Sequence, residues 1–271
     1  MNPGQTAEAN FFGHPIGLRT LFLTEMWERM SFYGMRALLV LYMTGAVTGF
    51  NGGLGFTQID AQAIYGIYVG MVYFMVVPGG WLADNLLGHQ RAVLYGGIVI
   101  TIGHFTLALP LQQTFFLGLA LVVLGTGLLK GNISTIVGEL YSGKDDQRDS
   151  GFTLFYMSIN IGSFLAVVIS PLLSKHTSFH MSFWLSAAGM TFALSNFLMR
   201  RKLFSNINNN TGREPLSSKK VLQSALIILF IILLLYYFYL QSLFHPLTLS
   251  LFSKSEIRHA NSHLTERRPE T

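Results

Sequence analysis

Apolar residues form long runs along this chain, and short polar stretches separate the runs. Each run is close to the roughly 20 residues that a helix needs to cross a hydrocarbon core. Backbone polar groups have no water partners in that core, so such runs cross it as helices. We therefore predict an all-α polytopic membrane protein, with helices at residues 17–47, 62–83, 91–109, 114–136, 151–173, 181–199 and 221–241.

Lysine and arginine are distributed unevenly between the two sets of loops. The loops after the first, third and fifth predicted helices carry only Lys175. Those after the second, fourth and sixth carry Arg91, Lys144, Arg148, Arg200, Arg201, Lys202, Arg213, Lys219 and Lys220. Cytoplasmic loops are enriched in these two residues. The pattern predicts a multi-pass cell-membrane protein whose N-terminus is cytoplasmic.

Composition agrees with a membrane protein and excludes some chemistries. The chain is 51% hydrophobic and 11% charged, against about 25% charged in soluble domains. It has no cysteine, so it forms neither a disulfide nor a cysteine-based metal site. Histidine, aspartate and glutamate show no metal-ligand spacing. The net charge of +5 comes from basic residues at helix ends, which does not indicate nucleic-acid binding.

The first apolar run contains a polar stripe of five side chains: Glu25, Glu28, Arg29, Tyr33 and Arg36. At 100° per residue they fall within an arc of roughly 140°, along about 16 Å of helix axis. One charged residue at the bilayer centre costs roughly 2.5–3.5 kcal/mol, so an intramembrane charge indicates a functional site. The alternative is an i,i+4 ion pair that only neutralises itself. We favour function, because buried ion pairs rarely repay their desolvation.

Other candidate residues occur in the later predicted helices. Tyr65 and Tyr68 fit either an interfacial aromatic belt or a cavity, whereas Tyr73 lies mid-segment, where its hydroxyl needs a partner. Lys130 lies near a helix end among glycines; it either snorkels to the headgroups or, as we expect, points into the bundle toward the carboxylates.

Two further polar features lie at helix ends. Asp84 and Arg91 bracket a short turn between the second and third predicted helices, and Asp84 could also be a simple cap. Tyr156 and Asn160 are one turn apart on the fifth predicted helix. They could line a polar cavity or only join helices.

The composition changes near residue 204. We divide the chain into a six-helix bundle (1–203), a polar cytoplasmic linker (204–220), an additional hydrophobic helix (221–252) and a charged tail (253–271) without the apolar residues of a core. Strict alternation would place the basic tail outside, against the charge rule. Either the last apolar run does not span, or this end is abnormal.

Three motifs together resemble a known family, the proton-dependent oligopeptide transporters of the major facilitator superfamily. The match covers about residues 17–200. The motifs are Glu25-x-x-Glu28-Arg29-x-x-Phe32-Tyr33-Gly34, Gly79-Gly80-x-x-Ala83-Asp84-x-x-x-Gly88-x-x-Arg91, and Phe155-Tyr156-x-x-Ile159-Asn160-x-Gly162.

The resemblance implies roles for individual residues. It implies a di-/tripeptide–proton symporter, not an enzyme, that uses a proton gradient and no cofactor. Proton coupling would involve Glu25, Glu28, Arg29 and Lys130. Substrate binding would involve Arg36, Tyr33, Tyr73, Lys130, Tyr156 and Asn160. Asp84 and Arg91 would belong to a cytoplasmic gate loop.

The chain departs from the family pattern in residue type and in length. Met30 and Asn85 replace an aromatic residue and an arginine. Such transporters have two six-helix halves around a midplane site, and only the first resembles this chain. We therefore expect a truncated form that does not catalyse proton-coupled uptake alone. The alternative is a non-transporting module that pairs with a separate second half or another copy. An intramembrane enzyme fits least, because the glutamates lack a metal or nucleophile partner.

Overall fold

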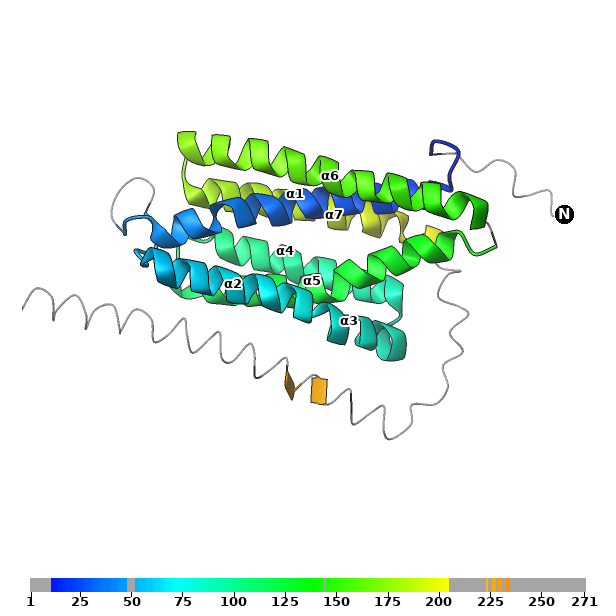
Figure 1. The fold of residues 1–271 in the computed structure, drawn as a ribbon, viewed down its shortest axis with the longest axis horizontal. Helices are drawn as coiled ribbons and strands as arrows, with labels where there is room; N and C mark the ends of the chain where they lie inside the picture. The colour runs from blue at the N-terminus through cyan, green and yellow to red at the C-terminus, as the bar shows by residue number, and fades with distance from the viewer. Residues whose placement is uncertain are drawn as a thin grey trace, which may run out of the picture.

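The computed structural model describes residues 11–47, 52–143 and 145–204, together with Gln223, Leu226, Ile227, Leu229, Phe230 and Leu233 (Figure 1). The described part is helical apart from its connections and a short bridge between Phe11 and His14. Its elements are α1 (Ile16–Thr44), α2 (Gln58–Phe74), α3 (Val76–Leu82), η1 (Ala83–Leu87), α4 (His89–Ala108), α5 (Gln112–Leu140), α6 (Asp145–His176), α7 (Phe179–Arg200) and η2 (Arg201–Phe204). The predicted all-α fold is confirmed.

Several predicted helix ends are wrong, and the errors have a common cause. α6 begins at Asp145 and not at 151, and α5 ends at Leu140 and not at 136. The extension of α6, residues 145–150, is entirely polar, and the extension of α5, residues 137–140, contains Glu139. Hydropathy detects only the part of a helix that crosses hydrocarbon, whereas the backbone hydrogen bonds continue into the aqueous phase.

The second predicted helix is interrupted. Met75 separates α2 from α3, and η1 has π-helical geometry. Pro78 lies four residues after Phe74 and has no N–H to donate to its carbonyl, which accounts for the break. The chain also approaches α5 closely here, because a Cβ added to Gly127 would lie 2.5 Å from the Met75 carbonyl oxygen. A Cβ added to Gly79 would likewise clash with the Gly127 carbonyl oxygen, so two glycines allow this bent segment to pack on α5.

The helices pack in pairs that run side by side (Figure 1). α1 packs along α6 and α7, and α4 packs along α5 and α7, while α2 and α3 lie on α5. Glycines allow the close approach of α4 and α5: a Cβ added to Gly96 would lie 2.7 Å from the Gly125 carbonyl oxygen. Such small-residue contacts join membrane helices, because lipid offers no hydrophobic drive for their association.

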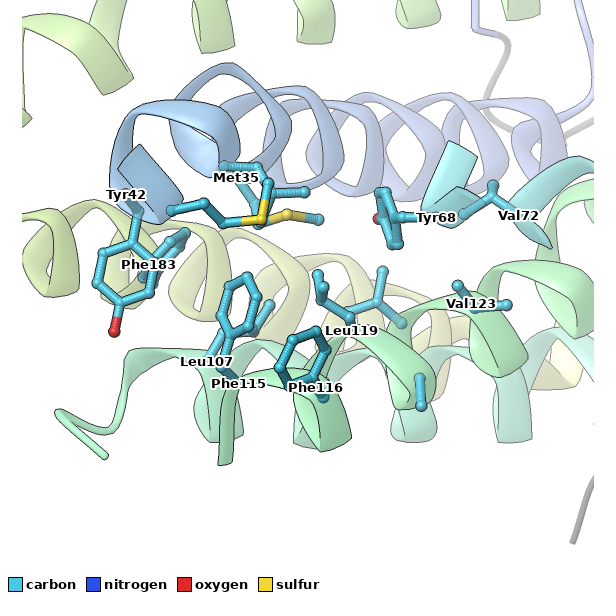
Figure 2. Packing of buried hydrophobic residues seen from close by; sticks show 14 of the residues in the cluster. Met35, Tyr42, Tyr68, Val72, Leu107, Phe115, Phe116, Leu119, Val123 and Phe183 are labelled. Carbon is cyan, nitrogen blue, oxygen red and sulfur yellow. The ribbon is translucent and has the colours of Figure 1, made fainter. Parts of the chain in front are cut away.

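One apolar cluster fills the space between α1, α2, α4, α5 and α7. Figure 2 shows part of it: Met35, Tyr42, Tyr68, Val72, Leu107, Phe115, Phe116, Leu119, Val123 and Phe183. A second cluster, which includes Leu18, Val137 and Phe197, lies toward the other end of the bundle. The core therefore runs the length of the helices. Its contacts fix which face of α1 is turned toward each neighbouring helix.

Four described segments are long and apolar enough to cross a membrane: Gln58–Leu87, His89–Ala108, Gln113–Leu140 and Asp146–His176. α1 has the length but carries five charged residues. The protein is thus a multi-pass membrane protein. The predicted linker after Phe204, the charged tail and most of the additional hydrophobic helix lie outside the described residues. Within that helix, the six described positions are helical, and the Phe230 ring lies 6.1 Å from the Phe74 ring.

Candidate functional site

Three charged side chains of α1 form a buried ion-pair cluster, which we call the α1 charge cluster: Glu25, Glu28 and Arg29. Their exposures are 2%, 1% and 2%. Arg29 Nε lies 3.1 Å from Glu25 Oε1 and also donates a short hydrogen bond to Glu28 Oε2. The i,i+4 spacing of Glu25 and Arg29 places their side chains on one face of the helix.

The α1 charge cluster is sealed from lipid by its neighbours. The Arg29 guanidinium lies over the Phe32 ring, 5.3 Å from its centroid. On α6, Gly162 allows the helices to touch, since a Cβ there would lie 3.0 Å from Arg29 Cβ. Glu25 Oε2, Glu28 Oε1 and Arg29 Nη2 are buried without hydrogen-bond partners among the described residues. The cluster is therefore tightly enclosed and incompletely satisfied.

Charge counting shows that the α1 charge cluster is unbalanced. Two ionised carboxylates and one guanidinium sum to −1. Buried charges are tolerated only when they are paired or neutralised. One of the two glutamates must therefore take up a proton, or a further cation must approach.

Lys130 of α5 is a candidate for that cation. Its half-buried ammonium lies within electrostatic reach of Glu25, Glu28 and Arg29. Among the described residues, however, no carboxylate lies within ion-pair distance of it. Its ammonium lies over the Tyr73 ring instead, 4.3 Å from the centroid. A cation–π contact of this kind is worth about 0.5–1 kcal/mol at exposed sites, which leaves the lysine free to change partner.

Arg36 lies about two helical turns from Arg29 and binds an aromatic residue of α2. Its Nε donates a short hydrogen bond to the Tyr65 hydroxyl, and its guanidinium lies 5.3 Å from the centroid of that ring. Tyr33, between the two arginines in sequence, is half-buried and packs edge-on against Phe32 at 5.4 Å. The predicted stripe of α1 thus continues from the buried cluster to partly exposed positions.

The remaining predicted substrate residues lie on exposed faces. Tyr73 of α2 is 56% exposed and Tyr156 of α6 is 53% exposed. Asn160, one turn after Tyr156, is also exposed. Tyr156 packs on Phe152 and Phe155, with ring centroids 6.0 and 5.9 Å apart. α6 therefore presents both residues outward, away from the packed core.

At one end of the bundle, His89 joins three helical elements. Its Nδ1 lies 3.0 Å from Asn132 Oδ1, and its Nε2 lies 3.5 Å from Asp84 Oδ1 and 3.8 Å from Glu139 Oε1. Asp84 therefore contacts the residue that begins α4, and not Arg91, whose side chain is exposed on another side. The turn at Gly88, with φ of +78°, brings His89 back toward Asp84.

The sequence did not predict that Tyr65, His89, Asn132 and Glu139 take part in these contacts. Tyr68 was predicted to lie either in an interfacial aromatic belt or in a cavity. It is 2% exposed and stacks on Phe32, with ring centroids 6.5 Å apart. The partners of Asp84 and Arg36 lie on other helices. Spacing along the sequence therefore gives no signal that would identify them. The described residues contain no group of three histidine, aspartate or glutamate side chains that could hold a metal ion.

Comparison with known proteins identifies the family. Residues 90–265, more than half of the chain, match the family described as PTR2, the POT family. A di-/tripeptide transporter of Lactococcus lactis subsp. lactis is 48% identical over 210 residues, which cover 77% of this chain and 41% of the relative. The peptide transporter YePEPT of Yersinia enterocolitica is 52% identical over 190 residues, covering 69% of this chain and 37% of the relative.

A solved structure agrees with these relatives. The crystal structure of a peptide transporter POT in complex with sulfate superposes with a TM-score of 0.78 at 44% identity. The superposition covers 88% of this chain and 48% of that structure. The chain thus spans about half the length of the proteins that it matches. The family match extends beyond Phe204, so residues predicted as linker, hydrophobic helix and tail also align with it. This chain belongs to the POT family.

Proposed function

We propose that this chain supplies the N-terminal six-helix half of a proton-coupled di-/tripeptide transporter in the cell membrane. Relatives that are 48% and 52% identical are named as a di-/tripeptide transporter and a peptide transporter. In this proposal the N-terminus is cytoplasmic, as the loop charges predict. The proton gradient is the energy source, and the chain uses no cofactor.

The unbalanced α1 charge cluster is the observation that carries the proposal. With both glutamates ionised, the excess negative charge attracts Lys130. A proton on Glu25 or Glu28 removes that attraction and leaves the ammonium available to another carboxylate. Proton binding and substrate binding are then linked, because both change the same charge balance.

The substrate carboxylate is expected at Arg36 and Lys130. Arg36 and Lys130 are half-buried, and each rests on a tyrosine ring that a carboxylate can displace. A guanidinium offers two parallel donors to a carboxylate. Tyr33, Tyr73, Tyr156 and Asn160 would contact the peptide itself, and Asp84 and Arg91 would act in the cytoplasmic gate loop.

The outward-facing apolar residues of α2 and α6 indicate where a second half would pack. In the most apolar stretch of each of these two segments 22% of the residues are buried, whereas in the corresponding stretch of α5 67% are buried. Alternating access requires one half to rock against the other around a midplane site. The same faces also support a second candidate function, a module that pairs with a separate half without transporting.

The test is uptake of a labelled dipeptide by liposomes with an inward proton gradient. The purified chain is reconstituted alone and after co-expression with the second half of the Lactococcus relative. We expect accumulation only with the second half, because one half supplies a single wall of the cavity. Glu25→Gln should abolish this accumulation. Arg148→Gln, an exposed charge outside the site, serves as the matched control and should leave it unchanged.

Three outcomes would contradict the proposal. Uptake that persists in the Glu25→Gln variant would show that Glu25 of the α1 charge cluster is not required for proton coupling. A co-purified complex that binds no peptide and accumulates none would favour the non-transporting module. Accumulation by the chain alone would show that two copies assemble into a transporter.

A further inference from the structure

A pocket of about 240 Å³ lies apart from the α1 charge cluster, where α4 begins and α7 ends. Its lining residues come from α4, α7 and η2: Gln90, Arg91, Leu94, Phe197, Arg201 and Lys202. We call it the α4–α7 pocket. It is open on one side and belongs neither to the His89 contacts nor to the outward faces of α2 and α6.

The polar side of the α4–α7 pocket is positively charged. Arg91, Arg201 and Lys202 line it, and no carboxylate does so among the described residues. Gln90 Nε2 donates a 2.7 Å hydrogen bond to the Arg201 carbonyl oxygen, which holds η2 against the first turn of α4. The N-terminus of α4 and the C-terminus of α7 have opposite dipoles. The attraction for an anion therefore comes from the side chains.

The inner side of the pocket is apolar and closely packed. Phe197 is 1% exposed and stacks on Phe204, with centroids 5.6 Å apart and the rings within 10° of parallel. Leu94, three residues after Arg91, lies one turn further along α4 on the same face. An anion bound by the arginines would thus rest against hydrocarbon.

An exposed apolar stripe of α4 continues from the pocket toward the middle of the helix. Tyr95 lies one turn beyond Arg91 and is 45% exposed, and Ile102 and Phe105 follow at helical spacing with exposed side chains. Phe105 meets Trp184 of α7 edge-on, at 5.4 Å between ring centroids. The α4–α7 surface is therefore apolar where it would face acyl chains and cationic where it would meet headgroups.

We propose that the α4–α7 pocket binds the phosphate group of an anionic glycerophospholipid, whose acyl chain lies on the apolar stripe of α4. Arginine binds phosphate with paired donors. The pocket is at the bundle end that carries the lysine- and arginine-rich loops, which corresponds to the cytoplasmic leaflet. A free phosphate would have no use for the adjoining stripe, so the geometry favours a lipid.

The experiment measures lipid retention by the purified 271-residue chain. Native mass spectrometry in detergent, with added phosphatidylglycerol or phosphatidylcholine, counts the bound lipids. We expect phosphatidylglycerol to be retained preferentially. The Arg91→Gln/Arg201→Gln variant should lose most of this preference for phosphatidylglycerol, whereas Arg148→Gln at the same end should bind as the unaltered chain does.

Further arms separate the lipid from its alternatives and from misfolding. Inorganic phosphate at millimolar concentration should neither bind nor displace phosphatidylglycerol. The Arg91→Lys/Arg201→Lys variant keeps the charges and should retain most of the affinity. Unchanged phosphatidylglycerol binding in the glutamine variant, or equal loss in Arg148→Gln, would overturn the site. Arginine-dependent binding of inorganic phosphate, with release of lipid, would overturn the lipid as its ligand. None of these readouts depends on peptide transport.

Discussion

Removal of the Arg29 guanidinium is expected to destabilise the bundle in a pH-dependent manner. Arg29→Met keeps a long apolar side chain over Phe32 but leaves Glu25 and Glu28 without a cation in direct contact. Both carboxylates are at most 2% exposed, so water cannot replace the lost partner. The variant therefore isolates the electrostatic contribution of the arginine.

The magnitude follows from two opposing contributions. Two unit charges about 4 Å apart attract by about 4 kcal/mol at an effective dielectric constant of 20, and Arg29 has two such partners. Its removal also recovers several kcal/mol of guanidinium desolvation. Removing one member of a buried pair accordingly costs about 3–5 kcal/mol in measured cases. We expect a similar loss at about pH 7.5.

Proton uptake should reduce this loss at lower pH. A carboxyl that is kept protonated costs about 1.4 kcal/mol for each pH unit above its ordinary titration near pH 4.3. One proton therefore costs about 4 kcal/mol at pH 7 and about 1 kcal/mol at pH 5. The folded variant binds more protons than the unfolded chain, so its stability rises as pH falls.

The assay is thermal unfolding of the purified chain in detergent at about pH 7.5 and about pH 5. For a chain of this size, 1 kcal/mol corresponds to roughly 2–4 °C. Arg29→Met should therefore lower Tm on the order of 10 °C at the higher pH and clearly less at the lower. The matched control, Glu25→Gln/Glu28→Gln/Arg29→Met, removes every charge and should recover most of the loss. An Arg29→Met variant with unchanged Tm, or with the same loss at both pH values, would refute the reasoning.

Three further predictions concern packing and polar contacts. Gly125→Val should separate α4 from α5 and lower Tm strongly, because a Cβ there would lie 2.7 Å from a backbone oxygen of α4. The control Gly66→Ala has no neighbour within 4 Å and should be neutral or stabilising by about 1 kcal/mol. Tyr65→Phe should release Arg36 and change dipeptide affinity, measured by scintillation proximity, with little change in Tm; a large Tm loss would make the contact structural. Burial raises the pKa of Tyr141 to about 12, so its neutral form favours the folded state and this stabilisation should be lost as the pH rises from about 10 to 12. Tyr141→Phe should remove that alkaline step in the unfolding midpoint, and its persistence would assign the step to another group.

The membrane fold was largely predictable from the apolar pattern. Hydrocarbon forces each crossing segment to satisfy its own backbone, so length and hydropathy identify the helices. The helical ends were less predictable, as the start of α6 at Asp145 shows. A helix that continues into water has no apolar signature, and only its hydrogen bonds define where it stops.

The sequence alone also determined that Glu25, Glu28 and Arg29 share one face, because the period of a helix fixes their angular relation. It could not determine contacts between helices. Lys130 lies over Tyr73, although a carboxylate partner was expected, and Arg36 binds Tyr65. Such pairings depend on how far each helix is rotated and shifted along its neighbours. Those two quantities are decided by backbone contacts between helices, which arise only in the tertiary structure.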